Sequence, residues 1–211
     1  ARAGNSECNL WHCWHRGPLR SSAVSDLDEH GGWPSLLTAL LDRQDLTAAQ
    51  ARAAMATILN GDATPAQLIG FVVALRAKGE TPEEISGLLD AVLAAATIVP
   101  LSDDLRLRAI DIVGTGGDRS HSINVSTMAA IVTAGAGVPV CKHGARAASS
   151  KCGTADVLEA LGVALELPPE GVVRCVEEAG IGFCLAPVYH PAFRFAAPSR
   201  REIGIPTVFN L

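Results

Sequence analysis

The sequence predicts an α/β protein, in which a small N-terminal helical domain precedes a larger domain with a mainly parallel sheet. Three observations support this class. Apolar residues recur at helical spacing over residues 34–99, strands alternate with helices after Pro100, and 48% of the 211 residues are hydrophobic while 18% are charged. We therefore divide the chain into a leader (1–32), a helical domain (33–100) and an α/β domain (101–211).

The leader differs in composition from the rest of the chain and shows neither a helical nor a strand period. It holds Trp11 and Trp14, two of the three tryptophans. We expect a disordered segment of unknown role or a misassigned start of the reading frame, since the first residue is not methionine. A zinc site is the alternative, although its donors lack the spacing of a standard finger: Cys8, His12, Cys13 and His15.

The helical domain contains three readable helix starts and a further short helix over residues 35–41. Each start is a capping box, in which a threonine hydroxyl accepts a backbone N–H and the side chain three residues later reaches back. Gly61 and Gly79 stand where the first two of these helices are expected to stop. The capping pairs are Thr47 with Gln50, Thr64 with Gln67, and Thr81 with Glu84.

In the α/β domain the predicted strands alternate with the predicted helices, which implies a parallel sheet covered on both faces. Ligands of such sheets collect at the carboxyl ends of the strands. The strands are expected over residues 109–113, 138–141, 163–167, 181–185 and 205–209. The helices are expected over residues 126–134, 154–161, 170–179 and 191–202.

Charge and cysteine content exclude several classes of function. A formal net charge of −5 argues against broad attraction to nucleic acid or to an anionic membrane, so an anion site must be local. No apolar run is long enough to cross a bilayer. Of the six cysteines, the last four lie in apolar or small-residue settings typical of reduced thiols, which indicates a reducing cytoplasm.

The most informative segment is residues 142–150, Lys-His-Gly-Ala-Arg-Ala-Ala-Ser-Ser. It combines two fixed cations, a histidine, a glycine and two hydroxyls without any large apolar side chain. Because Lys and Arg are rarely buried unless paired, we expect an exposed loop. Its chemistry suits a cradle for a multiply charged anion.

A glycine-rich turn at residues 114–118, Gly-Thr-Gly-Gly-Asp, precedes that segment. Arg119 at the sixth position excludes the dinucleotide fingerprint, and no Gly-Lys-Ser/Thr follows to make a Walker loop. Its bare amides can approach phosphate oxygens, as can the helix start at Asn124, Ser126 and Thr127. An ordinary turn between strand and helix is the alternative.

Asp118 narrows the choice of anion. A carboxylate repels phosphate unless it accepts hydrogen bonds from sugar hydroxyls or a divalent cation intervenes. The Ser126 hydroxyl is a hard oxygen ligand that suits Mg²⁺. Together these residues favour a phosphorylated sugar that carries a pyrophosphate.

Over residues 34–211 the chain resembles the anthranilate phosphoribosyltransferase family. Four motifs in the family's order carry the resemblance: residues 114–118, 124–127, 142–150 with 153–156, and 190–210. The resemblance implies a helical domain and a nucleoside phosphorylase/phosphoribosyltransferase-like α/β domain, paired as a homodimer through the helical domain. It implies Mg²⁺ and a cytoplasmic enzyme of tryptophan biosynthesis. That enzyme transfers phosphoribose from phosphoribosyl pyrophosphate to anthranilate, giving N-(5-phosphoribosyl)anthranilate and pyrophosphate.

The resemblance also implies site residues. Phosphoribosyl pyrophosphate is expected to contact Gly114, Gly117, Asp118, Ser122, Asn124, Val125, Ser126, Thr127, Lys142, His143, Gly144, Ala145, Arg146, Ala147, Ala148, Ser149, Ser150 and Thr154. Anthranilate is expected to contact Gly114, His143, Ala145, Ala186, Pro187, His190, Phe193 and Arg200, whose guanidinium faces the carboxylate. Ser126 is the expected Mg²⁺ ligand. A solvated helix end is the alternative for Arg200.

The implied mechanism needs no catalytic nucleophile, because pyrophosphate leaves through an oxocarbenium-like state that charge stabilisation and alignment promote. Ala145 stands where the family normally has asparagine. The chain stops before the family's further strands and its acidic Asp-Glu pair, so we expect a truncated α/β domain. A non-catalytic paralogue and a nucleoside-phosphorylase-like enzyme stay as alternatives, although the 190–210 run speaks against the latter.

Overall fold

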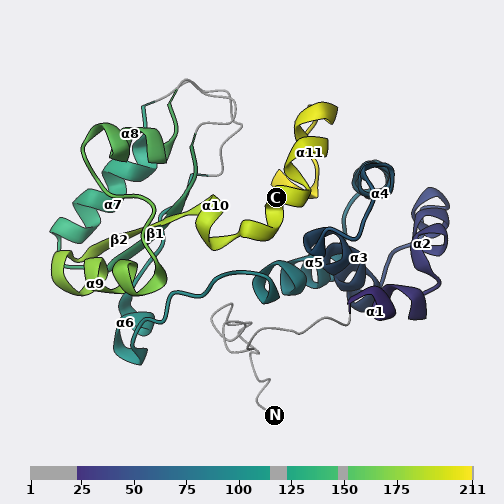
Figure 1. The fold of residues 1–211 in the computed structure, drawn as a ribbon, viewed down its shortest axis with the longest axis horizontal. Helices are drawn as coiled ribbons and strands as arrows, with labels where there is room; N and C mark the ends of the chain where they lie inside the picture. The colour runs from purple at the N-terminus through teal and green to yellow at the C-terminus, as the bar shows by residue number, and fades with distance from the viewer. Residues whose placement is uncertain (1–22, 115–122, 147–151, 211) are drawn as a thin grey trace, which may run out of the picture. The chain divides into compact units, whose positions relative to one another are not determined.

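The computed structural model describes residues 23–114, 123–146 and 152–210, and the chain forms two compact units (Figure 1). The first unit comprises the residues up to Ala96 together with Phe195–Phe209, and the second comprises Thr97–Arg194 with Asn210. The predicted boundary near residue 100 lies close to the observed one. The sequence did not predict that residues 195–209 return to the first unit. None of the helices in the described ranges combines the length and hydropathy that a membrane span requires.

The first unit is a helical bundle. Its elements are α1 (Ala23–Glu29), α2 (Gly32–Leu41), α3 (Ala48–Asn60), α4 (Pro65–Lys78), α5 (Pro82–Ala94) and α11 (Ala197–Ile203). All three predicted capping boxes are present at the starts of α3, α4 and α5. Gly61 and Gly79 end α3 and α4 with φ angles of 84° and 95°, which a side chain would disfavour. The local prediction of this unit is therefore confirmed.

Helix α1 begins inside the segment that the sequence assigned to a disordered leader. Its Leu27 is buried, and its Asp26 lies 3.7 Å from Arg52 of α3. The expectation of disorder is thus wrong for the last part of the leader. A seven-residue helix is too short to show a helical period, and only its packing against α2 and α3 reveals that it belongs to the bundle. The candidate zinc donors lie outside the described residues.

Apolar side chains from α2 and α4 form part of the bundle core. Leu36, Phe71 and Leu75 are fully buried, and Trp33 meets Phe71 edge to face with ring centroids 5.8 Å apart. The backbones of α3 and α5 lie very close together where the helices cross. A Cβ on Gly87 of α5 would stand only 2.1 Å from the carbonyl oxygen of Ala48 in α3, so only a glycine permits this contact.

One buried ion pair also holds the bundle together. The Glu84 carboxylate, fully buried in α5, accepts the backbone N–H groups of Leu46 and Thr81, both at 2.8 Å. Lys78 donates to the same carboxylate at 3.0 Å and to Asp45 at 2.7 Å. Burial disfavours the Lys78 charge, but these two hydrogen bonds outweigh it and raise the pKa of Lys78. Each buried charge therefore has its partners.

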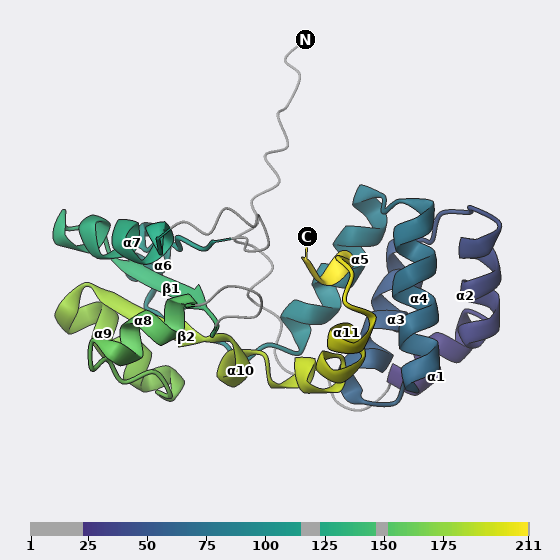
Figure 2. The ribbon, with the colours of Figure 1, turned by 90° about the horizontal axis from the view of Figure 1, so that it is seen from above.

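The second unit alternates helices with strands, as predicted (Figure 2). Its elements are α6 (Asp103–Arg108), α7 (Val125–Gly135), β1 (Val140–Gly144), α8 (Thr154–Ala160), α9 (Pro169–Ala179), β2 (Ile181–Leu185) and α10 (Ala186–Tyr189). Strands β1 and β2 are parallel, with Val140 opposite Ile181 and Gly144 opposite Leu185. Ile110 adds a parallel bridge on the other edge of β1, at Val140.

Helices pack on both faces of β2. Cys184 lies in one apolar cluster with Val172 and Val176 of α9, while Phe183 lies in another with Leu158 of α8. Successive side chains of a strand point to opposite faces, so α9 and α8 cover different faces. The expected parallel sheet with helices on both sides is confirmed.

Several predicted strands are not formed in the described residues. Residues 109–113 make only the bridge at Ile110, and residues 163–167 and 205–209 are irregular apart from a 3₁₀ turn, η3 (Val208–Asn210). The helix predicted over 191–202 is divided into a 3₁₀ helix, η2 (Pro191–Phe195), and α11. Short apolar runs become strands only where a neighbour pairs with their backbone, and the sequence does not specify that neighbour.

Candidate functional site

The carboxyl ends of the parallel segments meet at one edge of the second unit. Strand β1 ends at Gly144 and β2 ends beside it at Leu185. The segment that begins at Ile110 runs parallel to β1 and leads to Gly114 at the same edge. This arrangement confirms the prediction that the Gly114 turn and the Lys142 segment share the edge where ligands of such sheets collect.

The start of α7 lies next to Gly114. A Cβ on Gly114 would stand 3.4 Å from the Ser126 hydroxyl oxygen. Asn124 caps the helix, because its Oδ1 accepts the Thr127 hydroxyl at 2.8 Å and the Thr127 backbone N–H at 3.4 Å. The Ser126 hydroxyl donates to the same Oδ1 at 3.4 Å. Hydroxyls and the positive end of the α7 dipole are thereby collected beside Gly114, while Val125 contributes an exposed side chain.

Lys142 occupies a different place from the predicted exposed loop. It lies within β1, its side chain is buried, and its Nζ donates to the carbonyl oxygen of Ile112. Burial lowers the pKa of Lys142, and the charge of Asp111 opposes that shift. The expectation of exposure was wrong because the lysine stem packs inside the unit while its ammonium reaches a backbone acceptor.

Three rings form an edge-to-face row next to the end of β1. The rings of His143 and His190 have centroids 5.3 Å apart at 88°, and those of His190 and Phe193 are 5.8 Å apart at 90°. Burial lowers the pKa of both histidines. The charge of Asp111 opposes the shift of the His143 pKa, whereas Lys142 adds to it, and a charge on His143 would lower the pKa of His190 further. Burial therefore favours the neutral form of both rings. Within the part of the chain that the structure describes, the buried Nε2 atom of His143 has no hydrogen-bond partner, which makes it a candidate polar contact for a ligand.

Arg146 is neutralised by α8. Its two terminal nitrogens donate to both Glu159 oxygens at 2.5 and 3.0 Å, and its Nη1 lies 3.7 Å from Asp156. The hydrogen bonds to Glu159 raise the pKa of Arg146. The Arg146 side chain is 48% exposed, so its ion pair with Glu159 is solvated. A bound anion would therefore compete with Glu159 for Arg146 in a weak, solvent-screened pair.

The neighbouring residues complete this edge of the unit. The Ala145 carbonyl accepts the backbone N–H of Ala155 at 3.2 Å, and a Cβ on Gly144 would stand 3.1 Å from the Thr154 methyl. Ala186 and Pro187 begin α10 directly after β2. Seven predicted contact residues lie outside the described residues: Gly117, Asp118, Ser122, Ala147, Ala148, Ser149 and Ser150.

Arg200 belongs to the first unit, on α11. Its Nη2 donates to the Phe209 carbonyl at 3.3 Å, and its guanidinium carbon lies 4.8 Å from the centroid of the Phe209 ring. Burial lowers the pKa of Arg200. The alternative of a solvated helix end therefore does not describe this residue.

Sequence reasoning missed Asp111. Its carboxylate accepts the backbone N–H of His143 at 3.0 Å, so it contacts the candidate site directly. An available signal was a charged residue in the middle of an apolar predicted strand, three residues before Gly114. Carboxylates at that edge of a parallel sheet are candidates for site residues.

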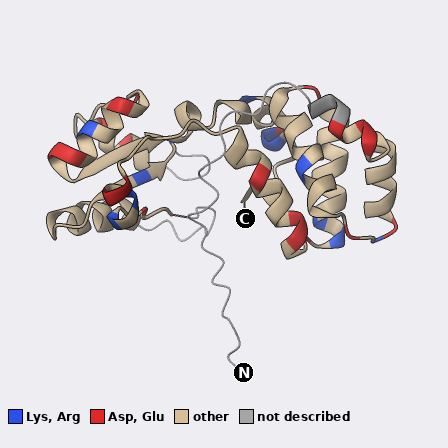
Figure 3. Cartoon of the chain, turned by 90° about the horizontal axis from the view of Figure 1, so that it is seen from below, with Lys and Arg blue, Asp and Glu red and all other residues tan. Residues whose placement is uncertain are grey.

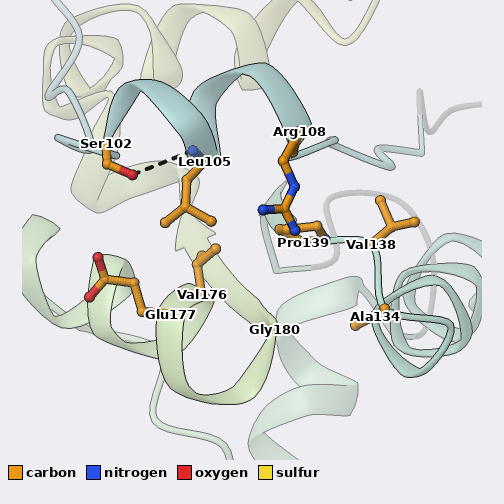
Figure 4. Close-up of a pocket in the computed structure, with 10 residues that line it drawn as sticks. Ser102, Leu105, Arg108, Ala134, Val138, Pro139, Val176, Glu177 and Gly180 are labelled. Carbon is orange, nitrogen blue, oxygen red and sulfur yellow. Dashed lines mark hydrogen bonds between the residues drawn. The ribbon is translucent and has the colours of Figure 1, made fainter.

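A separate pocket of about 460 Å³ opens at the other end of the strands (Figure 4). Pro139 and Gly180, which directly precede β1 and β2, line it together with Arg108 and Glu177. None of the predicted site residues lines this pocket. In Figure 3, Lys and Arg are scattered among Asp and Glu along the described chain, so no continuous basic stripe is visible there.

Two family models match the chain. The "Glycosyl transferase family, a/b domain" matches residues 106–211, and the "Glycosyl transferase family, helical bundle domain" matches residues 34–96. The two matched regions follow the order of the two predicted domains.

Curated relatives carry one common name. The anthranilate phosphoribosyltransferases of Saccharopolyspora erythraea and Salinispora arenicola are 65% and 60% identical to the chain over 181 and 178 residues. These alignments cover 86% and 84% of the chain, but 50% of each relative. The chain therefore spans about half the length of the curated relatives it matches.

Solved structures agree with the sequence relatives. The crystal structure of anthranilate phosphoribosyltransferase from Thermus thermophilus matches with a TM-score of 0.76 at 44% identity, covering 83% of this chain and 52% of that one. The Saccharomyces cerevisiae enzyme in complex with PRPP and Mg matches with a TM-score of 0.68 at 29% identity, covering 91% and 54%. These matches show that the chain belongs to the glycosyl transferase family and is similar to the anthranilate phosphoribosyltransferases within it.

Proposed function

We propose that the protein transfers the phosphoribosyl group of phosphoribosyl pyrophosphate to anthranilate, in tryptophan biosynthesis. The observation that carries the proposal is the shared edge of the second unit. There, Gly114 lies beside Ser126, and His143, the residue before the last one of β1, meets the ring of His190. Residues expected to contact the donor and residues expected to contact the acceptor therefore meet at the carboxyl ends of parallel strands. The names of the relatives support this reaction, and the half-length coverage keeps it a proposal.

The phosphates of the donor are proposed to bind between the Gly114 turn and the start of α7. The capping arrangement around Asn124 and Thr127 aims the helix dipole at this place, and dipole and amides both favour an anion. Lys142, whose ammonium lies at the Ile112 carbonyl two residues before Gly114, adds a buried positive charge that is strong in a medium of low dielectric constant. Arg146 adds a second cation once the anion displaces Glu159.

Mg²⁺ fits the donor chemistry of this place. The Ser126 hydroxyl and the Asn124 amide oxygen are hard ligands that lie 3.4 Å from each other. Among residues 23–114, 123–146 and 152–210, no group of three or more His, Cys, Asp or Glu side chains gathers to hold a metal. This fits an ion that takes its other ligands from phosphate and water. When bound, Mg²⁺ neutralises negative charge on the pyrophosphate.

Anthranilate is proposed to bind along the row of rings. Neutral His143 and His190, followed by Phe193, offer ring edges and faces to a flat aromatic acceptor. The His143 Nε2, which has no hydrogen-bond partner among the described residues, is proposed as a polar contact for the aromatic amine. Ala186 and Pro187 are proposed to add small apolar contacts.

The proposed chemistry relies on positioning and charge rather than on a protein nucleophile. As the bond from the anomeric carbon to pyrophosphate breaks, Lys142 and the α7 amides stabilise the charge that develops on the leaving group. The ring row holds the weakly nucleophilic amine in line with that carbon. Ala145 provides no side-chain amide for the acceptor, so alignment rests on the ring row.

The proposal is tested by incubating the 211-residue chain with phosphoribosyl pyrophosphate, Mg²⁺ and anthranilate, and following the loss of anthranilate fluorescence. Binding of phosphoribosyl pyrophosphate is measured separately by calorimetry. Turnover supports the proposal in full. Binding without turnover supports the donor site and indicates that further chain is needed for transfer. Absence of both results contradicts the proposal.

We also propose that the protein is cytoplasmic and forms a homodimer through the helical unit. Supporting the dimer, α5 exposes Ile85 and Leu89 at helical spacing, and Leu41 at the end of α2 is 75% exposed. Sedimentation equilibrium tests this, because Ile85→Asp with Leu89→Asp should give monomers. Supporting the cytoplasm, four of the six cysteines stand among apolar or small residues in the sequence, a setting typical of reduced thiols.

A further inference from the structure

The parallel pairing between residues 110–112 and β1 stops after one bridge. The Ile110 N–H donates to the Pro139 carbonyl at 3.0 Å, and the Cys141 N–H donates to the Ile110 carbonyl at 3.0 Å. In a continued parallel ladder the next N–H on this edge of β1, that of His143, would donate to the carbonyl two residues on, that of Ile112.

Two side chains replace that missing ladder step. The His143 N–H donates to the Asp111 carboxylate at 3.0 Å, and the Ile112 carbonyl accepts the Lys142 ammonium instead. The donor and the acceptor of the missing bond between His143 and Ile112 therefore both keep a partner. Asp111 and Lys142 also have opposite charges, and the Asp111 carboxylate favours the charged form of both Lys142 and His143.

These two side-chain hydrogen bonds fix the residues next to them in the candidate site. Ile112 lies two residues before Gly114, and His143 carries the ring that meets His190. Without the Asp111 carboxylate, the His143 amide has no described acceptor, and the bond from Lys142 to the Ile112 carbonyl is the described hydrogen bond that still joins the end of β1 to residues 111–114. Because Asp111 is exposed, its replacement leaves no cavity in the core.

We propose that Asp111 is a positioning residue of the phosphoribosyl pyrophosphate site, acting through the His143 amide to hold the end of β1 in register with residues 110–114. The inference rests on the proposed function for the identity of the ligand. Asp111 contacts neither substrate in this role. Its carboxylate oxygen accepts the His143 N–H in place of the Ile112 carbonyl, which would accept it in a continued parallel ladder.

The first test measures hydrogen exchange of the His143 amide in the 211-residue chain, by NMR, without ligand. Asp111→Ala removes the acceptor, so exchange should accelerate about tenfold or more, as expected for a hydrogen bond to a charged group. Asp111→Asn keeps an acceptor oxygen and should restore exchange to about the wild-type rate. Equal rates in wild type and Asp111→Ala would overturn the inference.

The second test measures binding of phosphoribosyl pyrophosphate with Mg²⁺ by calorimetry. Asp111→Ala should weaken binding about tenfold and Asp111→Asn should rescue it. An effect of charge alone predicts the opposite, because the loss of any carboxylate reduces repulsion of an anion. Asp103→Ala, which removes a side chain 94% exposed in the same unit, is the matched control and should leave binding unchanged.

The outcomes separate the two proposals. If the wild-type chain binds and Asp111→Ala binds equally well, the positioning role is wrong while the proposed function stands. If the wild-type chain does not bind, the donor site is wrong, and the exchange experiment still decides whether Asp111 holds the His143 amide. Weakened binding in both Asp111→Ala and Asp111→Asn would also overturn the role, because it would show that an acceptor oxygen at this position does not restore the site.

Discussion

Removal of Glu84 should destabilise the helical unit strongly. Its carboxylate is fully buried and satisfies the N–H groups of Leu46 and Thr81 as well as the ammonium of Lys78. Glu84→Ala leaves that ammonium, whose side chain is 3% exposed, with Asp45 as its remaining carboxylate. Breaking a buried pair in this way costs about 3–5 kcal/mol. The free energy of unfolding should fall by that amount.

The assay is urea unfolding followed by the fluorescence of Trp33, which packs on Phe71 inside the helical unit. The chain has three tryptophans, so the substitutions Trp11→Phe and Trp14→Phe leave Trp33 as the single tryptophan that fluoresces. With a slope of about 1.5 kcal/mol per molar urea, the midpoint should fall by about 2–3 M. Because Trp33 reports on the helical unit alone, the assay does not assume that both units unfold together.

The control is Glu83→Ala, which removes an exposed carboxylate from the same first turn of α5. It has the same effect on the helix dipole and should change stability by about 0.5 kcal/mol or less. A loss below about 1 kcal/mol for Glu84→Ala, or equal losses for both variants, would refute the reasoning, since burial and pairing are what distinguish Glu84.

The same ion pair predicts the alkaline limit of the helical unit. The pKa of Lys78 is raised in the folded state, so its contribution to stability is complete below the unfolded value, about 10.4, and is lost as pH rises through the folded value. The Trp33 unfolding midpoint should therefore fall above about pH 10.4. Lys78→Met should remove this part of the pH dependence, and an unchanged alkaline slope in that variant would contradict the assignment.

Three further results are expected in the α/β unit. Gly182→Ala should cost about 1–3 kcal/mol, because the new Cβ would stand 2.8 Å from a Val176 methyl, whereas Gly135→Ala meets nothing within 4 Å and should be neutral or stabilising in thermal unfolding. The pKa values of His143 and His190 should lie below 6.5 in NMR titrations, so stability of this unit should fall as pH drops through that value; midpoints at or above 6.5 would be inconsistent with their burial. Lys142→Met should abolish donor binding in calorimetry while circular dichroism stays unchanged, and unaltered affinity would exclude Lys142 from the donor site.

Local sequence signals predicted the helical unit well. A capping box needs only two residues three positions apart, and a glycine stop depends only on the φ angle of the glycine. The helix starts at Thr47, Thr64 and Thr81 and the stop at Gly61 could therefore be predicted without knowledge of distant contacts. Strand β2 was also predicted with its observed bounds, because an apolar run between Gly180 and Ala186 leaves little choice of ends.

Pairing partners explain the predictions that were wrong. Residues 109–113 and 205–209 resemble β2 in composition, but a strand exists only where another backbone lies alongside, and this depends on segments far away in the chain. The end of β1 was placed at Cys141 because Lys142 and His143 are polar. The strand extends to Gly144 because its polar residues find acceptors and rings in distant segments.

The motif sequences alone identified the family and the chemical nature of the site: glycine-rich amides, hydroxyls at a helix start, two cations and a run of rings. Tertiary contacts decided how those groups are used. Lys142 is buried because the Ile112 carbonyl, 30 residues earlier, receives its ammonium, and His143 is held by the Asp111 carboxylate, 32 residues earlier. Residue type sets which interactions a side chain can make, but burial and charge partners depend on contacts that only the folded chain creates.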